Sequence, residues 1–421
     1  MNSPPEVVIT GMGVVSPIGI GRADFRDALY AGRSGVRRIE SFDATALPID
    51  FGGEVAQFDP KQYVRPRKSL KVMSREIQFG FAAADLAMVD ARLASENVDS
   101  DRFGVVYGAD MIYCEPEELA AAYRACVVDG RFDFDRWGGH ALAEMYPLWL
   151  LKYLPNMAAC HVSIALDARG PSNSITLGEV SSLVAIMEAT RIIQRGAADV
   201  MLAGGASNRL HPNVMIFRNQ SLMSNRRDDP AAACRPFDRD RDGMVAGEGA
   251  GAVVLESRAH ADARGAKILA HVLGFGSTFA APQRGGTSAA AARRAMETAL
   301  REAGLSPADV GHVNASGLST AEHDRAEAEA IVSLLGDVPV TAPKSLFGNL
   351  GASTAAVELA ASLLALDERR VPATINYDNP DPVCAINVVR GEPAALAKTA
   401  AITLNQSPHG QSVAMVIAGA S

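Results

Sequence analysis

The chain has 421 residues, of which 48% are hydrophobic and 21% charged, and this composition is typical of a globular protein with a large core. Its net charge of −8 gives no reason to expect binding to nucleic acid or to an anionic membrane surface. No apolar run approaches the ~20 residues of a membrane-spanning helix, no signal peptide is recognisable, and the scattered cysteines predict neither a disulfide framework nor a zinc site.

The first half of the chain alternates apolar runs with helical patterns, which predicts the α/β class. The runs are continuous and apolar, as in the buried strands of a layered sheet, and they lie at residues 7–10, 104–108 and 199–206. Helices are expected at residues 21–31 and 74–88.

Residues 113–153 are the least regular stretch, and they contain both tryptophans, Trp137 and Trp149. We interpret this stretch as helical excursions over the sheet, at a subunit interface or at the wall of a pocket. An insertion that packs on the surface is an equally open interpretation.

Residues 170–196 contain the most informative pattern of the chain. A Gly-Pro turn opens it, a short apolar run follows at 174–177, and a break at 178–182 leads into apolar residues at near-helical spacing that end at Gly196. We expect a strand that turns sharply into a buried helix, with Glu179 at the corner. Such a corner lies beside free backbone N–H groups, where proteins hold an activated nucleophile or a bound anion.

The second half repeats this organisation. Further strands are predicted at 252–256 and 268–275, helices at 288–302 and 352–366, and a hairpin at 400–418. A charged loop at 235–243 is predicted to be a solvated face whose arginines and aspartates pair with each other. Residues 174–206 and 340–375 both run from a strand through a corner of small residues into an apolar helix, and this echo indicates a duplicated α/β unit.

Short motifs extend over nearly the whole chain, at residues 8–13 (Val-Ile-Thr-Gly-Met-Gly), 170–172, 203–206, 235–238, 247–251 and 372–376 (Pro-Ala-Thr-Ile-Asn). Together they resemble the β-ketoacyl-acyl-carrier-protein synthases, the condensing enzymes of fatty acid and polyketide assembly. The resemblance implies a thiolase-like fold, with duplicated α/β halves in a five-layer αβαβα architecture. The expected N-terminal half spans residues 1–258, and the expected C-terminal half spans residues 259–421.

The resemblance fails at the residues that carry the family's chemistry. The corner residue of the family is the acyl-accepting cysteine, whereas this chain has Glu179. The two family histidines, which bind the extender carbonyl, are replaced by Ser316 in the 314–318 motif and by Asn349 in the 344–349 motif. Neither replacement titrates near neutral pH, so neither can perform general acid–base catalysis there.

Other parts of the family site are retained or altered. Lys344 is retained, with three residues that resemble its acidic neighbours, Asp324, Glu327 and Glu358. His409 replaces the phenylalanine of the family's Gly-Phe-Gly-Gly loop. His323 is expected on the surface or behind the residues that line the site.

Three interpretations of the function remain open. The first is a non-condensing subunit, similar to a chain-length factor, in which Glu179 plugs the old site and accepts hydrogen bonds from Asn349 and Ser316. The second is an acyltransferase in which Glu179 attacks a thioester and forms an acyl anhydride, with His409 as the only nearby base. The third is an ordinary 3-oxoacyl-acyl-carrier-protein synthase.

The resemblance also implies the partners. We expect acyl carrier protein or acyl-CoA, and a homodimer or a heterodimer with an active ketosynthase. The basic stretch at 65–68 is either a solvated loop or a contact for an acidic carrier protein. We expect a cytoplasmic protein that holds no cofactor and no metal.

Overall fold

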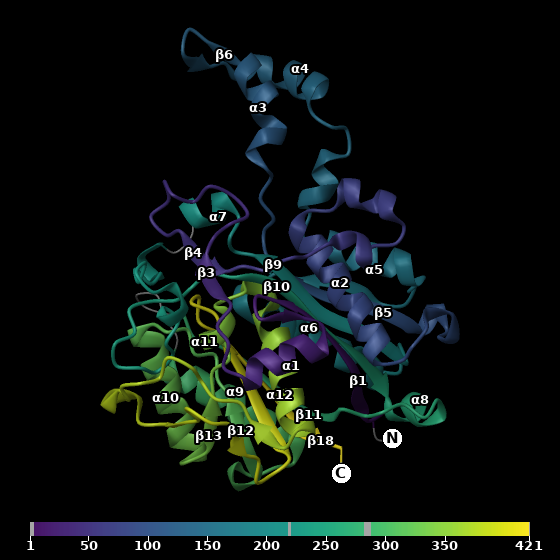
Figure 1. The fold of residues 1–421 in the computed structure, drawn as a ribbon. Coiled ribbons are helices and arrows are strands. Elements are labelled where there is room, and N and C mark those ends of the chain that lie inside the picture. The colour runs from purple at the N-terminus through teal and green to yellow at the C-terminus, as the bar shows by residue number, and fades with distance from the viewer. Residues whose placement is uncertain (1–3, 218–219, 282–287, 421) are drawn as a thin grey trace.

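The computed structural model describes residues 4–217, 220–281 and 288–420. Most of its strands form one sheet in the order β15-β13-β12-β17-β18-β11-β1-β10-β9-β5-β8 (Figure 1). This sheet consists of two half-sheets, which are joined only where Val7–Ile9 of β1 pair with Ala270–Val272 of β11. The polypeptide therefore builds two strand layers that meet along one short seam.

The first half-sheet contains β1 (Val7–Ser16), β5 (Phe103–Ala109), β8 (Ser172–Ile175), β9 (Val200–Asn208) and β10 (Glu248–Ser257). The second contains β11 (Ala270–Phe279), β12 (Val310–Asn314), β13 (Pro339–Thr341), β15 (Asn387–Val388), β17 (Ala400–Gln406) and β18 (Gln411–Gly419). The hairpin predicted at the C-terminal end is confirmed by the antiparallel pairing of β17 with β18. Apart from a hairpin described below, the remaining strands are short: β2 (Gly19–Ile20), β3 (Val36–Arg38), β4 (Phe51–Gly53), β14 (Arg370–Val371) and β16 (Ala394–Ala395).

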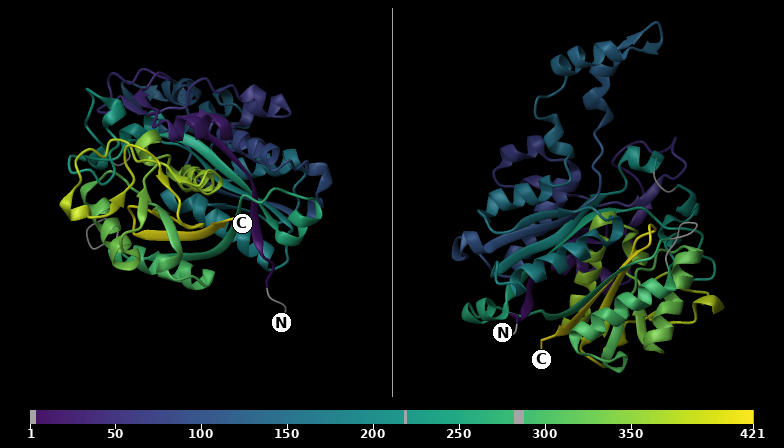
Figure 2. Two further views of the ribbon diagram at one scale, coloured as in Figure 1. Left: turned by 60° about the horizontal axis from the view of Figure 1, so that its bottom comes forward. Right: turned by 180° about the vertical axis from the view of Figure 1, so that it is seen from behind.

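Helices occupy the space between the half-sheets and cover both outer faces (Figures 1 and 2). The central layer consists of α6 (Ser181–Gln194) and α12 (Thr354–Asp367). The outer layers are α2 (Arg75–Asp90) with α5 (Met157–Leu166) on one side and α9 (Ala289–Ala303) with α10 (Ala321–Leu335) on the other. This is the predicted five-layer αβαβα architecture. The other helices are α1 (Arg22–Tyr30), α7 (Pro212–Phe217), α8 (Arg258–Ala263) and α11 (Lys344–Phe347), beside the two described below.

The central helices are buried because their sequences are apolar over most of their surface. Every residue of α12 from Thr354 to Leu366 is buried, and so are Leu183, Ile186 and Ile193 of α6. Each helix follows a single 3₁₀ turn, η6 (Gly178–Val180) before α6 and η10 (Gly351–Ser353) before α12. The predicted echo between the two halves is thus confirmed as a repeated corner that leads into a central helix.

Residues 113–148, which we call the arm, stand away from the body of the molecule (Figures 1 and 2). The arm contains α3 (Pro116–Ala125), the hairpin of β6 (Val127–Val128) and β7 (Arg131–Phe132), and α4 (Phe134–Glu144). The prediction of helices lying over the sheet was therefore wrong. The arm has its own small apolar cluster, in which the Tyr123 ring stacks on Trp137 at 4.9 Å between centroids, and local periodicity cannot indicate that this cluster lies outside the body.

The prediction that loop 235–243 is a solvated face was also wrong. Asp238 is fully buried, and Arg235 and Arg241 are 7% and 9% exposed. Asp238 accepts hydrogen bonds from Nε of Arg235 at 3.0 Å and from the backbone N–H groups of residues 378 and 379. Arg235 and Asp238 thus pair within the loop, as predicted, but Arg241 pairs with Asp381 at 2.6 Å and with Asp324 at 3.5 Å, which an alternating Arg/Asp pattern does not reveal.

Close packing of α2 on β1 requires glycine at position 13. A Cβ atom there would lie 2.0 Å from the backbone oxygen of Ala83 and 2.6 Å from the backbone nitrogen of Ala87. We predict that Gly13→Ala lowers the free energy of unfolding by about 1–3 kcal/mol, because α2 must move off the sheet. The matched control is Gly139→Ala in α4, where a Cβ meets no atom within 4 Å. This control should be neutral or stabilising by up to about 1 kcal/mol. Urea midpoints measure both effects, and equal midpoints for the two variants would contradict the packing argument.

Candidate functional site

Glu179 lies in the corner between β8 and α6, where the sequence predicted it. Gly178 adopts a left-handed conformation with φ of 62°, which allows the chain to turn sharply. The hydroxyl of Ser181 fixes the turn, because it accepts from Leu177 N–H at 2.8 Å and donates to Gly178 C=O at 2.6 Å. As a result the Glu179 side chain is buried, with 2% exposed, at the N-terminal end of the helix.

The carboxylate of Glu179 is paired with a buried arginine that the sequence analysis missed. Nη1 of Arg209 donates to Oε1 of Glu179 at 2.7 Å, and Nε of Arg209 lies 3.4 Å from Oδ2 of Asp110. Burial opposes the charge of Arg209, but the two carboxylates outweigh it and raise the pKa of Arg209 above its usual range. One cation therefore lies between two carboxylates at the bottom of the site.

These three charged residues meet because of the sheet topology. β5 is parallel to both β8 and β9, so the carboxyl ends of the three strands lie at one edge. Asp110 directly follows β5, Arg209 directly follows β9, and Glu179 comes four residues after the end of β8. A search for charged residues just beyond the ends of the predicted parallel strands would have found the whole group.

Asn349 also contacts Glu179, as predicted. Its Nδ2 donates to Oε1 of Glu179 at 3.3 Å. Its Oδ1 accepts from the backbone N–H of Gly351 at 3.0 Å and from the hydroxyl of Thr354 at 3.2 Å, at the start of the second corner. These partners fix the orientation of the amide, so that its NH₂ group points at the carboxylate of Glu179. An amide does not titrate near neutral pH, so Asn349 cannot act as a general acid or base.

Ser316 does not contact Glu179 through a hydrogen bond, contrary to the prediction. Its backbone is clamped, because its carbonyl accepts from Nζ of Lys344 at 2.5 Å and its N–H donates to Glu327 at 2.7 Å. Its hydroxyl is buried and has no hydrogen-bond partner among the residues that the structure describes. Oε1 of Glu179 instead accepts from Arg209 and Asn349, while the Ser316 backbone is held by Lys344 and Glu327.

Lys344 and its acidic neighbours form a rigid frame behind this loop. Nζ of Lys344 lies 2.5 Å from Oε1 of Glu358, and Nδ2 of Asn405 donates to the other oxygen at 2.6 Å. Glu327 binds the loop rather than the lysine, and burial raises its pKa to about 8. Asp324 accepts from Phe237 N–H at 2.8 Å instead of from Lys344.

His409 is exposed and lies at the rim of a cavity of about 470 Å³ above the charged group. Its backbone N–H donates to Oγ of Ser407 at 3.3 Å. The walls of the cavity are Ala109, Asp110, Met111, Thr176, Gly178, Glu179, Arg209, Phe217 and His409. None of the five cysteines, all of which lie in described segments, is among them.

His323 is buried, with 6% exposed, so of its two expected places the surface is excluded, and it is not among the residues that line the cavity. Its Nδ1 lies 2.8 Å from Oγ1 of Thr320. Burial lowers its pKa, and the nearby charge of Glu179 acts in the opposite direction. His409 is therefore not the only imidazole close to Glu179.

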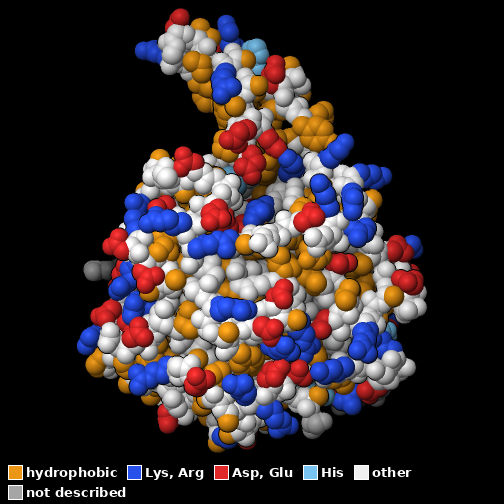
Figure 3. Space-filling view, viewed as in Figure 1, with side chains coloured by type: hydrophobic (Ala, Val, Ile, Leu, Met, Phe, Trp, Pro, Cys, Tyr) orange, Lys and Arg blue, Asp and Glu red, His pale blue; other side chains and the backbone are white. Residues whose placement is uncertain are grey.

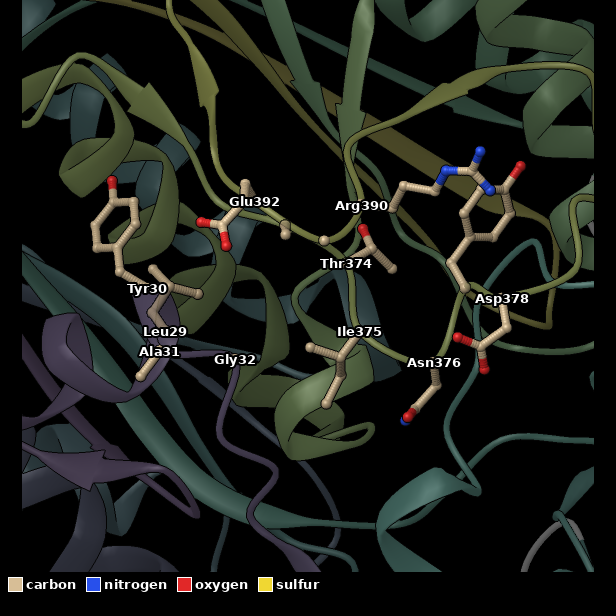
Figure 4. Close-up of a pocket in the computed structure, with 13 residues that line it drawn as sticks. Leu29, Tyr30, Ala31, Gly32, Thr374, Ile375, Asn376, Asp378, Arg390 and Glu392 are labelled. Atoms are coloured by element: carbon tan, nitrogen blue, oxygen red, sulfur yellow. The ribbon is translucent and has the colours of Figure 1, made fainter.

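A second cavity of about 440 Å³ lies elsewhere, between the C-terminal end of α1 and residues 373–378 and 390–392 (Figure 4). Tyr30 and Glu392 lie on one side of it, and Arg390 and Asp378 lie on the other. None of the predicted site residues lines this cavity, so it is separate from the Glu179 corner.

Two properties concern the described segments as a whole. No group of three or more histidine, cysteine, aspartate or glutamate side chains in them is arranged to hold a metal ion. No helix among them is long and apolar enough to cross a membrane.

The five-layer fold, in which two corner helices meet, is the thiolase-like architecture that condensing enzymes share. Residues 5–261 match the family described as beta-ketoacyl synthase, N-terminal domain, and residues 269–378 match its C-terminal domain. The chain belongs to the beta-ketoacyl synthase family.

Similar proteins are known from both sequences and structures. The chain is 34% identical over 420 residues to a 3-oxoacyl-[acyl-carrier-protein] synthase 2 of Synechocystis, and the match covers 97% of both chains. Among solved structures, the ishigamide ketosynthase/chain length factor aligns with a TM-score of 0.87 at 27% identity, over all of both chains. A ketosynthase described in complex with a type II polyketide acyl-carrier protein aligns with a TM-score of 0.84 at 30% identity, also over all of both chains.

Removal of the buried cation tests whether the charges at the corner depend on one another. We predict that Arg209→Met lowers the free energy of unfolding by about 3–5 kcal/mol, because it removes the cation that is paired with the buried carboxylate of Glu179. Adding Glu179→Gln to Arg209→Met should restore part of this loss. Chemical denaturation of the two single variants and the double variant gives the coupling free energy, and purely additive effects would contradict the pairing.

Proposed function

We propose that this chain is a non-condensing member of its family, which binds or shapes acyl chains while a paired synthase performs the condensation. The observation that carries the proposal is the 2.7 Å contact between Arg209 and Glu179, at the corner where the resemblance places the acyl-accepting cysteine. A carboxylate bound to a guanidinium is a weak nucleophile, because its charge is already engaged by a cation. The side chain at the corner thus pairs with Arg209 and does not attack a thioester.

The surroundings of Glu179 support the same conclusion. The contacting oxygen, Oε1, receives hydrogen bonds from both Arg209 and Asn349. Asn349 and Ser316 cannot take up or release a proton near neutral pH. Decarboxylation of a malonyl group is also disfavoured, because the carboxylate of Glu179 repels the substrate carboxylate.

The surface around β8 supports a partner of the same fold. In the described sheet β8 is a terminal strand paired only with β5, and its backbone groups can accept another strand. α5 has the sequence Met-Ala-Ala-Cys-His-Val-Ser-Ile-Ala-Leu, yet only three of its residues are buried and Ile164 is 78% exposed. The arm adds Phe134 and Leu142, which are 80% and 88% exposed, and Figure 3 shows hydrophobic side chains on the surface of the arm. Such apolar exposure is typical of a protein interface.

An acyl carrier protein is the proposed source of the acyl chain. Arg65, Arg67, Lys68 and Lys71 lie in the turns before α2 and are exposed. Figure 3 shows Lys and Arg side chains gathered beside the base of the arm. A basic cluster of this kind attracts an acidic partner and increases the rate of association.

The central experiment is a turnover assay with intact-mass detection. The purified chain is incubated with acyl- and malonyl-carrier protein, and the expected result is neither an acyl adduct nor a 3-oxoacyl product. A labile adduct that disappears in Glu179→Gln would instead favour the acyltransferase. Condensation by the chain alone would favour an ordinary synthase, as the names of its relatives suggest, and either outcome would overturn the proposal.

The proposed pairing surface is tested by light scattering. We predict that the protein is a dimer, alone or after addition of an active synthase, and that Ile164→Asp weakens this dimer at least about tenfold because a charge must be desolvated in the interface. The matched control is Val383→Asp, which also replaces an exposed apolar residue, 59% exposed, beside α10 on the outer layer of the other half-sheet. Equal dissociation constants for the two variants would show that the surface around β8 is not the interface.

A further inference from the structure

One oxygen of the Glu179 carboxylate has no hydrogen-bond partner among the described residues. The two donors at the corner, Nη1 of Arg209 and Nδ2 of Asn349, both bind Oε1, at 2.7 and 3.3 Å. No hydrogen bond or ion pair within the described segments involves Oε2. Such an oxygen is unusual in a residue that is only 2% exposed, because buried polar groups are almost always hydrogen-bonded. It indicates a ligand that supplies the missing donor.

This oxygen can be reached from the cavity of about 470 Å³ above the corner. Glu179 lines the cavity, whereas Asn349, which binds the Oε1 side of the carboxylate, does not. The polar atoms that are sealed without a partner inside the described protein do not include Oε2. Oε2 therefore lies on the cavity side of the carboxylate, where a bound molecule can contact it.

The walls of the cavity favour a ligand with an apolar body and one polar end. Ala109, Met111 and Phe217 contribute apolar surface, and the last two are exposed to solvent. Thr176 and His409 are exposed as well, so water can satisfy their polar atoms. Pockets of this kind bind the apolar part of a ligand by contact and fix its orientation through a few polar groups. Oε2 of Glu179 is such an orienting group.

The chemistry of a paired carboxylate selects the group that can bind Oε2. An ionised carboxylate only accepts hydrogen bonds, so a second carboxylate or an ether oxygen cannot bind it. Its charge is already paired with Arg209, so an ammonium group would lose its hydration without gaining a counter-charge of its own. The groups that remain are uncharged donors, namely hydroxyl and amide N–H.

We propose that Oε2 of Glu179 accepts a hydrogen bond from an uncharged O–H or N–H donor of an acyl ligand that is bound in this cavity. The donor site rests on the proposed function, because it assumes that the corner binds an acyl ligand without being acylated. It also defines the ligand class more closely. The ligand carries its donor at the end of an apolar chain or on the pantetheine amides beside the thioester, and the experiments below separate these two sources.

Two isomeric probes isolate the contribution of the donor in the unaltered protein. n-Hexanol donates a hydrogen bond, whereas methyl pentyl ether has the same atoms and only accepts one. We expect the alcohol to bind about 5- to 20-fold more tightly, because hydrogen bonds to an ionised acceptor are stronger than those between neutral groups. NMR titration measures both dissociation constants, and equal constants would overturn the proposal. Tighter binding of hexylammonium than of n-hexanol would also overturn it, because the site would then select a cation.

The variant Glu179→Gln tests the atom itself, because its neighbours determine the orientation of the new amide. Arg209 and Asn349 are both donors, so they should retain the amide oxygen and leave its NH₂ group facing the cavity. The cavity would then present a donor, and the preference for the alcohol over the ether should fall to about one. Thr176→Val is the matched control, since Thr176 also lines the cavity, and it should keep the preference. A preference lost in Thr176→Val and kept in Glu179→Gln would overturn the proposal.

The source of the donor is identified with acyl-pantetheine analogues in which CH₂ replaces the thioester sulfur, so that no transfer is possible. Tighter binding of an analogue with a hydroxyl group on its acyl chain identifies the chain as the source. Equal binding that weakens in Glu179→Gln identifies the pantetheine amides, and equal binding that this variant leaves unchanged would overturn the donor site. Condensation in the turnover assay together with the alcohol preference would reject the proposed function and retain the donor site, so the two failures are distinguishable.

Discussion

Arg209 lies between Glu179 and Asp110, and this buried cation determines what the corner can do. A lone carboxylate buried at this depth would be strongly destabilising, and a lone guanidinium equally so. Together they are tolerated because each ion is paired and also hydrogen-bonded: Asp110 accepts from the Ser207 hydroxyl at 2.8 Å and from Ala352 N–H at 3.1 Å. The position of Ala352 in the second corner shows that the charged group also connects the two halves of the fold.

The buried polar residues behind the Ser316 loop fix the position of its backbone. Lys344, Glu358 and Asn405 form a continuous buried chain of contacts that ends on the Ser316 carbonyl. Because Lys344 binds the backbone carbonyl of residue 316 and not its side chain, these contacts do not depend on which residue occupies position 316. A retained Lys344 is therefore compatible with the loss of catalytic histidines, and its presence alone does not indicate activity.

The sequence was sufficient for most of the fold, because its strands and central helices are strongly patterned. The run at 174–177 followed by the break at 178–182 predicted the corner and Glu179, and the echo at 340–375 predicted the second corner. The arm was misplaced, since the apolar contacts among Tyr123, Phe132 and Trp137 look the same in a sequence whether they lie inside or outside the body.

The partners of Glu179 were harder to predict because they depend on strand order. Asn349 was identified through a motif, but Arg209 and Asp110 belong to no motif considered in the sequence, and only the adjacency of β5, β8 and β9 brings them together. For a similar reason the sequence did not decide between the two expected places of His323, the surface or a position behind the residues that line the site. A polar residue in the first turn of a helix is usually exposed, and its burial here results from the packing of the 316–320 loop against α10.

The identity of residue 179 and the presence of Arg209 depend on each other through charge. Exchange of Glu179 for a thiol would remove one of the two carboxylates that balance Arg209. A thiolate at that position would be drawn into the same ion pair, because it too lies at a helix N-terminus beside a cation. Its pKa would fall, but its charge would be directed at Arg209 and not at the cavity. The proposed function therefore places the difference from a condensing site in the pair Glu179 and Arg209 and not in Glu179 alone.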